Sequence, residues 1–452
     1  MIDLKDYTMA DYLNKTLDCE CGKEHSASTK HVLICEEALH ELPKLLSKND
    51  FHKSFLIFDS TTYELTGEKL EQILHNAGHA FTSYQIPMPE PTPDEKTLGE
   101  ILINFDRTCD HIIAIGSGTI NDLSRFISYQ LKLPYLIIAT APSMDGYASN
   151  VAPLIVNHMK TTFEAHVPFG IIADTNLLKD APIKMIASGI GDILGKYTCL
   201  CDWKIAHLIT GEYYCQTVEN IVRKSMNTVV SNIDHAANRD PHAIKSIMEA
   251  LVLTGIAMSY VGNSRPASGS EHHLSHYWEM MYLFDGKKPV LHGTKVGIGT
   301  VAVIKAYELL LTKKIDFNQA KEKAATYSKQ NWETLMRDTY SLAAESVITL
   351  ENDIGKNRPE AVITRITALQ DNWNEVTNMI RQLPTADTIR GYLDSLKAPS
   401  NPISIGIDKT TFVNSFLVAK ELRNRFGLLQ LLYDLGLAEE IANELWEYFT
   451  QL

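Results

Sequence analysis

The sequence predicts an α/β amino-terminal domain with a parallel sheet, followed by an all-α carboxy-terminal domain. Three short apolar runs in the first third each end in glycine, proline or aspartate, as buried parallel strands do. They alternate with stretches of helical spacing, which indicates right-handed crossovers and a Rossmann-like, doubly wound sheet. Later in the chain strand signals are few and apolar positions recur at helical spacing. With 452 residues, two domains are favoured over one, and we expect them to be residues 1–180 and residues 181–452.

The strands and helices of the first third follow one another along the chain. FLIFD at residues 55–59 is the first buried strand, and the helix TGEKLEQILHNAG comes next. IPMPEPTPD at residues 86–94 is a proline-rich connection that cannot continue a helix. HIIAIGSG at residues 111–118 is the second strand, followed by the helix INDLSRFISYQL, and YLIIAT at residues 135–140 is the third strand.

The second half contains three long stretches whose apolar positions have helical spacing. They are TVENIVRKSMNTVVSNIDHAA, HAIKSIMEALVLTGIAMSYV and KVGIGTVAVIKAYELLL. These stretches are the basis for expecting a helical second domain.

Charge and composition argue against several classes of partner. The formal net charge is −13 and the sequence pI is about 5.7, whereas a broad nucleic-acid or anionic-membrane surface needs a basic excess. The first residues lack a basic segment followed by an apolar one, and no apolar run approaches the roughly 20 residues that span a bilayer. We therefore expect a soluble cytoplasmic protein with no nucleic-acid or membrane partner.

Seven cysteines are too few and too irregularly spaced for a disulfide scaffold, so we expect them to be thiols. Cys19, Cys21 and His25 in CECGKEH could bind a metal or lie in a surface loop. Structural zinc usually takes four ligands, and no second pair follows at the spacing of a zinc finger. A surface loop is the favoured interpretation.

A glycine-containing loop follows the second strand. Glycines let the backbone approach a pyrophosphate, and the amide groups that begin the next helix attract its negative charge. The third glycine of the usual dinucleotide fingerprint is missing, so a tight strand-to-helix turn explains the segment equally well. The loop residues that would bind a dinucleotide are Gly116, Ser117, Gly118, Thr119, Ile120, Asn121 and Asp122.

Two further strand ends carry polar groups. The carboxylate of Asp59 could accept hydrogen bonds from the adenosine ribose, which would favour NAD over NADP, or it could cap the next helix. Asp59 precedes the glycine loop, whereas the usual acidic residue follows that loop by about 20 residues. The third strand ends in a loop that would face the ligand at this edge of the sheet, Thr140-Ala141-Pro142-Ser143-Met144-Asp145-Gly146.

Three features of the second half suit a divalent metal. Asp192 lies between glycines at an expected helix start. His272 and His276 are four residues apart on one helix face, and His292 precedes a glycine-led helix. Two imidazoles and one carboxylate suit zinc, iron or nickel and leave a position open for a substrate oxygen. Because the chain has 16 histidines, such a pair also arises without function, and surface or core-bonded histidines are the alternative.

The motifs together resemble a known family. They are GSGTIND, TAPSMDGYAS, GDILGKYT, SRPASGSEHHLSH and HGTKVGIGT, and they extend from about Asp59 to His292. Their order and spacing are similar to those of the sn-glycerol-1-phosphate dehydrogenases of the bacterial type. That group belongs to the iron-containing alcohol dehydrogenase and glycerol dehydrogenase superfamily, which is related in structure to dehydroquinate synthase. The resemblance therefore implies a dehydroquinate synthase-like fold.

The resemblance also implies roles for individual residues. Asp192, His272 and His292 would bind the metal, and Asp192 would also lie at the substrate. Asp145 would bind a substrate hydroxyl and His276 would act as a proton-relay partner, so these two would be the catalytic residues. Residues 116–122 and 140–143 would hold the dinucleotide, with Ser149 near the nicotinamide.

The identity of the metal follows from a departure from the family pattern. Iron-dependent relatives carry a further histidine where this chain has Lys196. The departure suggests three protein ligands and argues against iron, and the bacterial branch favours nickel, with zinc next.

The implied reaction is the reversible reduction of dihydroxyacetone phosphate to sn-glycerol 1-phosphate with NAD(H), possibly NADP(H). Its product would supply ether-type glycerophospholipid, and a homodimer is expected. The alternatives are a glycerol or polyol dehydrogenase acting on an unphosphorylated substrate, a catalytically inactive binding protein and, more distantly, a lyase.

Three residues near these motifs have alternatives of their own. Asp145 could simply form an Asp-Gly turn. Arg265 is a candidate for the substrate phosphate or an exposed structural arginine, and His273 is expected to be structural or solvent-facing.

Overall fold

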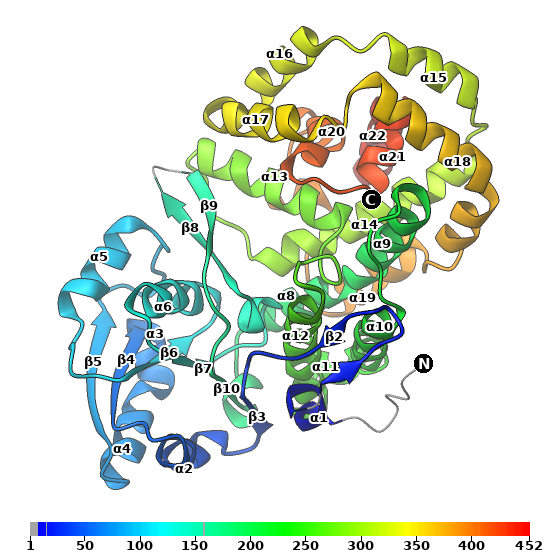
Figure 1. The fold of residues 1–452 in the computed structure, drawn as a ribbon. Coiled ribbons are helices and arrows are strands. Elements are labelled where there is room, and N and C mark those ends of the chain that lie inside the picture. Colours follow the sequence, from blue (N-terminus) through cyan, green and yellow to red (C-terminus); the bar gives the residue numbers. More distant parts are fainter. Residues whose placement is uncertain (1–7, 15, 157–158) are drawn as a thin grey trace. The chain divides into compact units, whose positions relative to one another are not determined.

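The chain forms two compact units, which a computed structural model describes for residues 8–14, 16–156 and 159–452 (Figure 1). Unit 1 comprises the described residues up to Ile193 together with Gln216–Ser264. Unit 2 comprises Leu194–Cys215 and Arg265–Leu452. The predicted architecture, an α/β part followed by a helical part, is confirmed.

Unit 1 contains a six-stranded sheet in which every pair of neighbours is parallel. Its order is β3-β10-β7-β6-β4-β5. The three strands predicted from apolar runs are β4, β6 and β7. The strands are β3 (His31–Cys35), β4 (Lys53–Asp59), β5 (Ala80–Ile86), β6 (His111–Gly116), β7 (Tyr135–Ala139) and β10 (Gly170–Asp174).

Unit 1 has two antiparallel hairpins outside this sheet. One pairs β1 (Leu17–Asp18) with β2 (Glu24–His25), and the other pairs β8 (Val151–Val156) with β9 (Met159–Glu164). The first hairpin holds the CECGKEH segment, in which His25 is 0% and Cys19 6% exposed. The expected surface loop is therefore wrong, because the hairpin turns two of these side chains into the protein.

Helices flank the sheet and complete unit 1. They are α1 (Met9–Asn14), α2 (Leu42–Lys48), α3 (Ser60–Thr62), α4 (Glu68–Asn76), α5 (Glu95–Asn104), α6 (Gly118–Leu131), α7 (Thr175–Leu178), α8 (Ile183–Leu194, which ends at the unit boundary), α10 (Gln216–Val230), α11 (Ile233–Ala237) and α12 (Pro241–Val261), with the short turns η1 (Ala38–Glu41), η2 (Tyr63–Gly67) and η3 (Gly146–Ala148).

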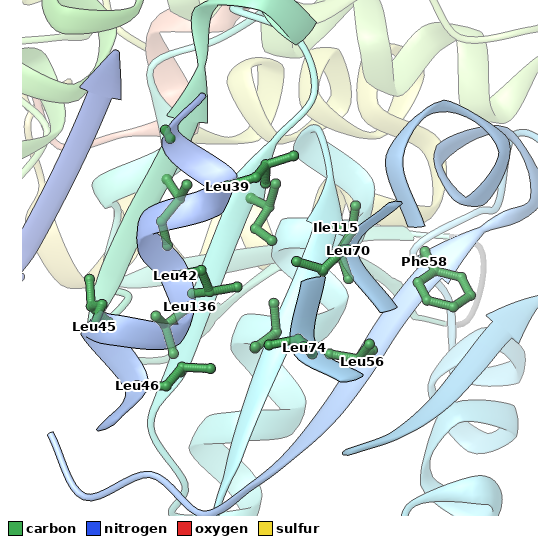
Figure 2. Packing of buried hydrophobic residues seen from close by; sticks show 14 residues of the cluster. Leu39, Leu42, Leu45, Leu46, Leu56, Phe58, Leu70, Leu74, Ile115 and Leu136 are labelled. Atoms are coloured by element: carbon green, nitrogen blue, oxygen red, sulfur yellow. The ribbon is translucent and has the colours of Figure 1, made fainter. Parts of the chain in front are cut away.

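The core on one face of the sheet follows the two-residue period of the strands. Figure 2 shows Leu56 and Phe58 of β4 with Ile115 and Leu136, packed under leucines of η1, α2 and α4. The residues between them in these strands are buried as well, so both faces of the sheet are covered. This double burial is why the strands read as continuous apolar runs.

Unit 2 is helical, and no strand occurs among its described residues. Its helices are α9 (Lys196–Thr210), α13 (Ser270–Phe284), α14 (His292–Thr312), α15 (Phe317–Ala325), α16 (Lys329–Tyr340), α17 (Ala344–Ile354), α18 (Pro359–Ile380), α19 (Ala386–Ser395), α20 (Lys409–Val418), α21 (Leu428–Asp434) and α22 (Ala438–Thr450), with the turns η4 (Ser341–Ala343), η5 (Pro402–Ile405) and η6 (Ala419–Leu422).

The units do not follow a single cut of the chain. A boundary after residue 180 would place α10, α11 and α12 in the helical part, whereas they cluster with the sheet in unit 1. The predicted helix at 217–237 is divided into α10 and α11.

Helix α12 is long and apolar enough to span a membrane, although the sequence predicted no such segment. In the described part of the chain, α12 has the length and composition to cross a membrane, with a mean hydropathy of 1.4 over its most apolar stretch. Of that stretch, 67% is buried, as in a core helix.

Candidate active site

The sheet has a topological switch point between β4 and β6. From β4 the chain continues outward to β5, then returns to β6 and proceeds through β7 toward β10 on the other side. Ligands of open α/β sheets bind outside the carboxyl ends of the strands at such a point. Because Ile57 pairs with Ala114, the same register brings Asp59 and Gly116 to this edge together.

The glycine loop leads directly into α6. A Cβ on Gly116 would lie 2.6 Å from Cβ of Ile120, so this position requires glycine. The helix begins at Gly118, and its first amide groups have no partner within the helix, as an anion site needs. Asn121 is buried, whereas Asp122 accepts a hydrogen bond of 2.7 Å from Arg125.

The two predicted dinucleotide loops are in direct contact. The Ser117 and Ser143 hydroxyls lie 2.6 Å apart, and the Thr140 amide donates to the carbonyl of Gly116 at 3.1 Å. The sequence placed both loops at one edge of the sheet, and the structure joins them there. The hydroxyl of Tyr147, which the sequence did not single out, donates to the carbonyl of Ala141.

Asp59 is the N-cap of α3. Its carboxylate accepts the amide of Thr62 at 2.7 Å, and the Thr62 hydroxyl accepts the amide of Asp59 at 3.0 Å. Burial raises the pKa of Asp59, although the bonds from Thr62 oppose that shift. The capping role is therefore present, and it holds the carboxyl group at the switch point.

Asp192 is in the last turn of α8, not at a helix start as predicted. The glycines on either side of it suggested a helix start, but the helix continues past the first of them. Three residues before Asp192, a Cβ on Gly189 would lie 1.9 Å from the Pro142 carbonyl oxygen. Helix and loop thus approach so closely that only glycine fits, and the helix continues past it. The fully buried carboxylate of Asp192 accepts the backbone amide of Asp145 at 2.9 Å.

Two polar residues, one near the end of the third loop and one just after it, are held in place by the local structure. Asp145 is 8% exposed and precedes the turn η3. The Ser149 hydroxyl accepts the amide of Val151 at 3.2 Å, so Ser149 forms a turn before β8. Asp145 thus belongs to the third loop, and Ser149 follows that loop.

Three histidines of unit 2 form a cluster of rings. The centroids of His272 and His292 are 5.2 Å apart, and those of His276 and His292 are 5.7 Å apart. The i, i+4 pair lies on α13 as predicted, and His292 is the first residue of α14. Helix α13 and the start of α14 bring all three rings together, so these histidines are not scattered over the surface.

Glu271 is a partner of His272 that the sequence did not indicate. The Nδ1 of His272 donates to the carboxylate at 2.7 Å, so Nε2 is the ring nitrogen that can bind a metal. The Thr198 hydroxyl and the Gly269 amide also donate to it, at 2.6 and 2.7 Å. Burial raises the pKa of Glu271, but these bonds and the imidazole charge outweigh it and hold the pKa below its usual value.

Three other residues that the sequence analysis discussed are buried inside the protein. Arg265 is 2% exposed and forms a two-pronged ion pair with Glu212, so the expectation of an exposed arginine is wrong. His273 is 5% exposed, which excludes the solvent-facing alternative. Lys196 is fully buried, and its Nζ donates to the carbonyl of Ala267 at 2.9 Å.

Solved structures show the same fold. A glycerol dehydrogenase from Schizosaccharomyces pombe superposes with a TM-score of 0.59, covering 93% of this chain and 92% of the other. Its sequence is 14% identical. At that identity the likeness concerns the fold alone.

Sequence comparison is more specific. Residues 33–182 match the family described as iron-containing alcohol dehydrogenase. A glycerol-1-phosphate dehydrogenase (NAD(P)+) of Geobacillus thermodenitrificans (strain NG80-2) is 31% identical over 439 residues, covering 94% of this chain and 100% of the relative. The enzyme of the same name from Geobacillus stearothermophilus is 31% identical over 437 residues, covering 96% and 99%. The chain therefore belongs to the glycerol-1-phosphate dehydrogenase family, a group of NAD(P)-dependent oxidoreductases among the iron-containing alcohol dehydrogenases.

Proposed function

We propose that this enzyme interconverts dihydroxyacetone phosphate and sn-glycerol 1-phosphate with NAD(H), and possibly NADP(H), at a divalent metal. The similarity to glycerol-1-phosphate dehydrogenases over nearly the whole chain is the observation that carries the proposal. The cluster of histidine rings on α13 and α14 supports it, because imidazoles can bind a metal. In an oxidoreductase of this kind the bound metal would polarise the substrate carbonyl.

Asp192, His272 and His292 are the proposed metal ligands, and each offers one ligand atom. Two imidazoles and a carboxylate fit nickel or zinc, and we favour nickel. The hydrogen bond from His272 to Glu271 is typical of a ligating histidine. The hydroxyl of Thr198, six residues after Asp192, also donates to the Glu271 carboxylate. The residues present therefore fit a metal held by three protein ligands.

The dinucleotide is proposed to lie over the switch point. The amide groups that begin α6 would receive the pyrophosphate, with the 116–119 and 140–143 segments on either side. Ile120, Asn121 and Asp122 would support this loop, since the first two are buried and Asp122 binds Arg125. Asp59 would meet the ribose, and Ser149 would lie near the nicotinamide.

The substrate residues are proposed to be Asp145, His276 and, through its ligand position, Asp192. When bound, the metal would draw electron density from the carbonyl and the nicotinamide would supply the hydride. His276 would pass a proton to the former carbonyl oxygen of the substrate. Its ring is partly exposed, so it could take up a replacement proton from water. Asp145 would accept a hydrogen bond from the substrate hydroxyl, in a position set by its amide bond to Asp192.

The setting of the reaction is also a proposal. The acidic net charge of −13 supports a cytoplasmic enzyme that does not bind nucleic acid or membranes. We favour a homodimer and a product that enters glycerophospholipid of the ether type.

The test compares turnover of dihydroxyacetone phosphate and of unphosphorylated dihydroxyacetone by the metal-loaded enzyme. We expect a clear preference for the phosphate, loss of activity on chelation, and best recovery with nickel. The variant His272→Ala should lose both the catalytic metal and NADH oxidation. A preference for the unphosphorylated ketone would contradict the substrate, and full activity of His272→Ala would contradict the metal mechanism.

A further inference from the structure

We propose that the chain also holds a structural zinc ion, bound by Cys19, Cys21, His25 and Cys215. None of these residues belongs to the proposed active site. The proposal corrects the surface-loop interpretation of the CECGKEH segment and is independent of the substrate.

The β1–β2 hairpin brings three soft ligands together within unit 1. The Cys19 and Cys21 sulfur atoms and a ring nitrogen of His25 lie within 4.8 Å of one another. The amide of Gly22 closes the turn by donating to the carbonyl of Cys19 at 2.9 Å. Gly22 has φ of +81°, a left-handed conformation that glycine adopts without strain. The turn therefore folds both cysteines toward the histidine.

His25 is oriented as a metal ligand would be. Its Nδ1 lies 2.9 Å from the carbonyl oxygen of Tyr260 and donates to it, which places the lone pair on Nε2. Nε2 faces the sulfur of Cys21 at 3.3 Å. The ring is fully buried and stacks on the ring of Tyr260, with centroids 5.5 Å apart. A ligating histidine usually donates its other nitrogen to a carbonyl or carboxylate in this way.

Cys215 is the fourth ligand. It immediately precedes α10, in which the hydroxyl of Thr217 lies 3.2 Å from the sulfur of Cys19. Two residues of extended chain span at most about 7 Å, so Cys215 is within reach of the hairpin. Its side chain is 0% exposed, and it belongs to the same group of potential ligands.

The chemistry of this set identifies the ion and its role. Three thiolates and one imidazole form a closed tetrahedral zinc site, which leaves no position for a substrate or water. Such a site would fasten the hairpin to the start of α10 and the end of α12, because His25 also binds Tyr260. Metal binding then contributes to the stability of the fold and takes no part in hydride transfer.

The first test is metal analysis of the full chain after dialysis against a mild chelator. We expect the wild type to retain one zinc per chain and Cys21→Ser to lose it. Cys35→Ser is the matched control, because Cys35 is an exposed thiol of unit 1 outside the group, and it should keep the ion. His272→Ala should also keep it, which separates this ion from the active-site metal.

A second measurement applies even if Cys21→Ser does not fold. Wild-type enzyme produced with cobalt should show a thiolate-to-cobalt charge-transfer band, and a mercurial thiol reagent should release the retained ion and lower the Tm. The absence of a retained ion in the wild type would overturn the proposal. So would a disulfide among these cysteines in the unreduced protein, or loss of all metal from His272→Ala.

Discussion

Glu271 illustrates how a residue beside a ligand can determine what that ligand does. It is fully buried, and its carboxylate accepts hydrogen bonds from His272, Thr198 and Gly269. A buried charge of this kind is tolerated only when several donors compensate for lost hydration. The same bonds fix the His272 ring and its tautomer, so the orientation of Nε2 is set before any ion arrives.

Replacing Glu271 by glutamine tests this arrangement. The amide preserves the shape but removes the negative charge, so His272 becomes a less basic ligand. We expect metal affinity and kcat to fall about 10-fold to 100-fold, in the range usual for such partners. Chelator competition and steady-state kinetics measure the two effects.

The matched control is Glu351→Gln, a buried carboxylate of α17 whose partner is the Asn357 amide. It should leave metal affinity unchanged. If the Glu271 variant binds metal as tightly as the wild type, the carboxylate does not orient His272.

At the scale of residues, the sequence identified those site residues that lie close together along the chain. The i, i+4 pair of His272 and His276 was visible because both residues lie on one helix. Glu271 was missed because a carboxylate next to a histidine is common and its role depends on Thr198, far earlier in the chain. Cys215 was missed for the same reason, since the fold alone brings it within reach of the hairpin.

The packing of α8 against the third loop is the decisive contact at the scale of elements. Ser188 donates to the carbonyl of Ser143 at 2.9 Å, and the Pro142 carbonyl occupies the space that a side chain at Gly189 would need. The loop is thereby held in contact with Ser117 at the switch point. Asp192, one turn further along α8, is positioned by the same helix.

Gly189→Ala and Gly99→Ala should therefore have opposite effects on stability. A Cβ at Gly189 meets a backbone oxygen at 1.9 Å, so helix or loop must move, with lower Tm and higher KM for the dinucleotide. At Gly99, inside α5, nothing lies within 4 Å of a Cβ. There alanine should stabilise the helix by up to about 1 kcal/mol without changing KM. Thermal unfolding and NADH titration measure both variants, and an unaltered KM in Gly189→Ala would show that the loop does not hold the cofactor.

The strands of the sheet were unequally visible in the sequence. β4, β6 and β7 are covered on both faces, so their central positions are apolar and the run is conspicuous. β5 is an edge strand in which exposed and partly buried residues are mixed, so no apolar run marks it. β3 lies at the other edge, and only one of its five residues is buried.

For the whole molecule, periodicity predicted the helices but not which unit they join. α10 and α12 resemble the helices of unit 2 in their apolar spacing, yet they cluster with the sheet. The local pattern records that a helix has a buried face, but it does not record which partner covers that face. Long-range contacts decide this, and a single sequence does not contain them.

The stability of the chain should fall in mild acid, and His111 is a main cause. It lies at the start of β6, fully buried, with Nε2 at 2.7 Å from the Ser54 hydroxyl and Nδ1 at 2.6 Å from the Asp110 carboxylate. Burial lowers the pKa of His111 to about 4, although Asp110 opposes the shift. Burial also lowers the pKa of His79, which shares the Ser54 hydroxyl.

The sign of the effect follows from these shifts. An unfolded histidine has a pKa of about 6.5, so in mild acid the unfolded chain takes up a proton that folded His111 refuses. The stability is fully present above about pH 6.5, declines as the pH falls, and levels off below about pH 4. The loss due to His111 alone is about 3 kcal/mol.

Urea unfolding between about pH 7 and about pH 4 tests this, because that range contains both pKa values. His111→Gln cannot take up the proton, so its free energy of unfolding should fall less steeply with acid, although His79 still contributes. His75→Gln is the control, because His75 is an exposed residue of α4, and its slope should match that of the wild type. A histidine buried in its neutral form has to steepen the fall of the unfolding free energy with decreasing pH. If the free energy of unfolding falls equally steeply in His111→Gln and the wild type, His111 is not a cause of the instability in acid.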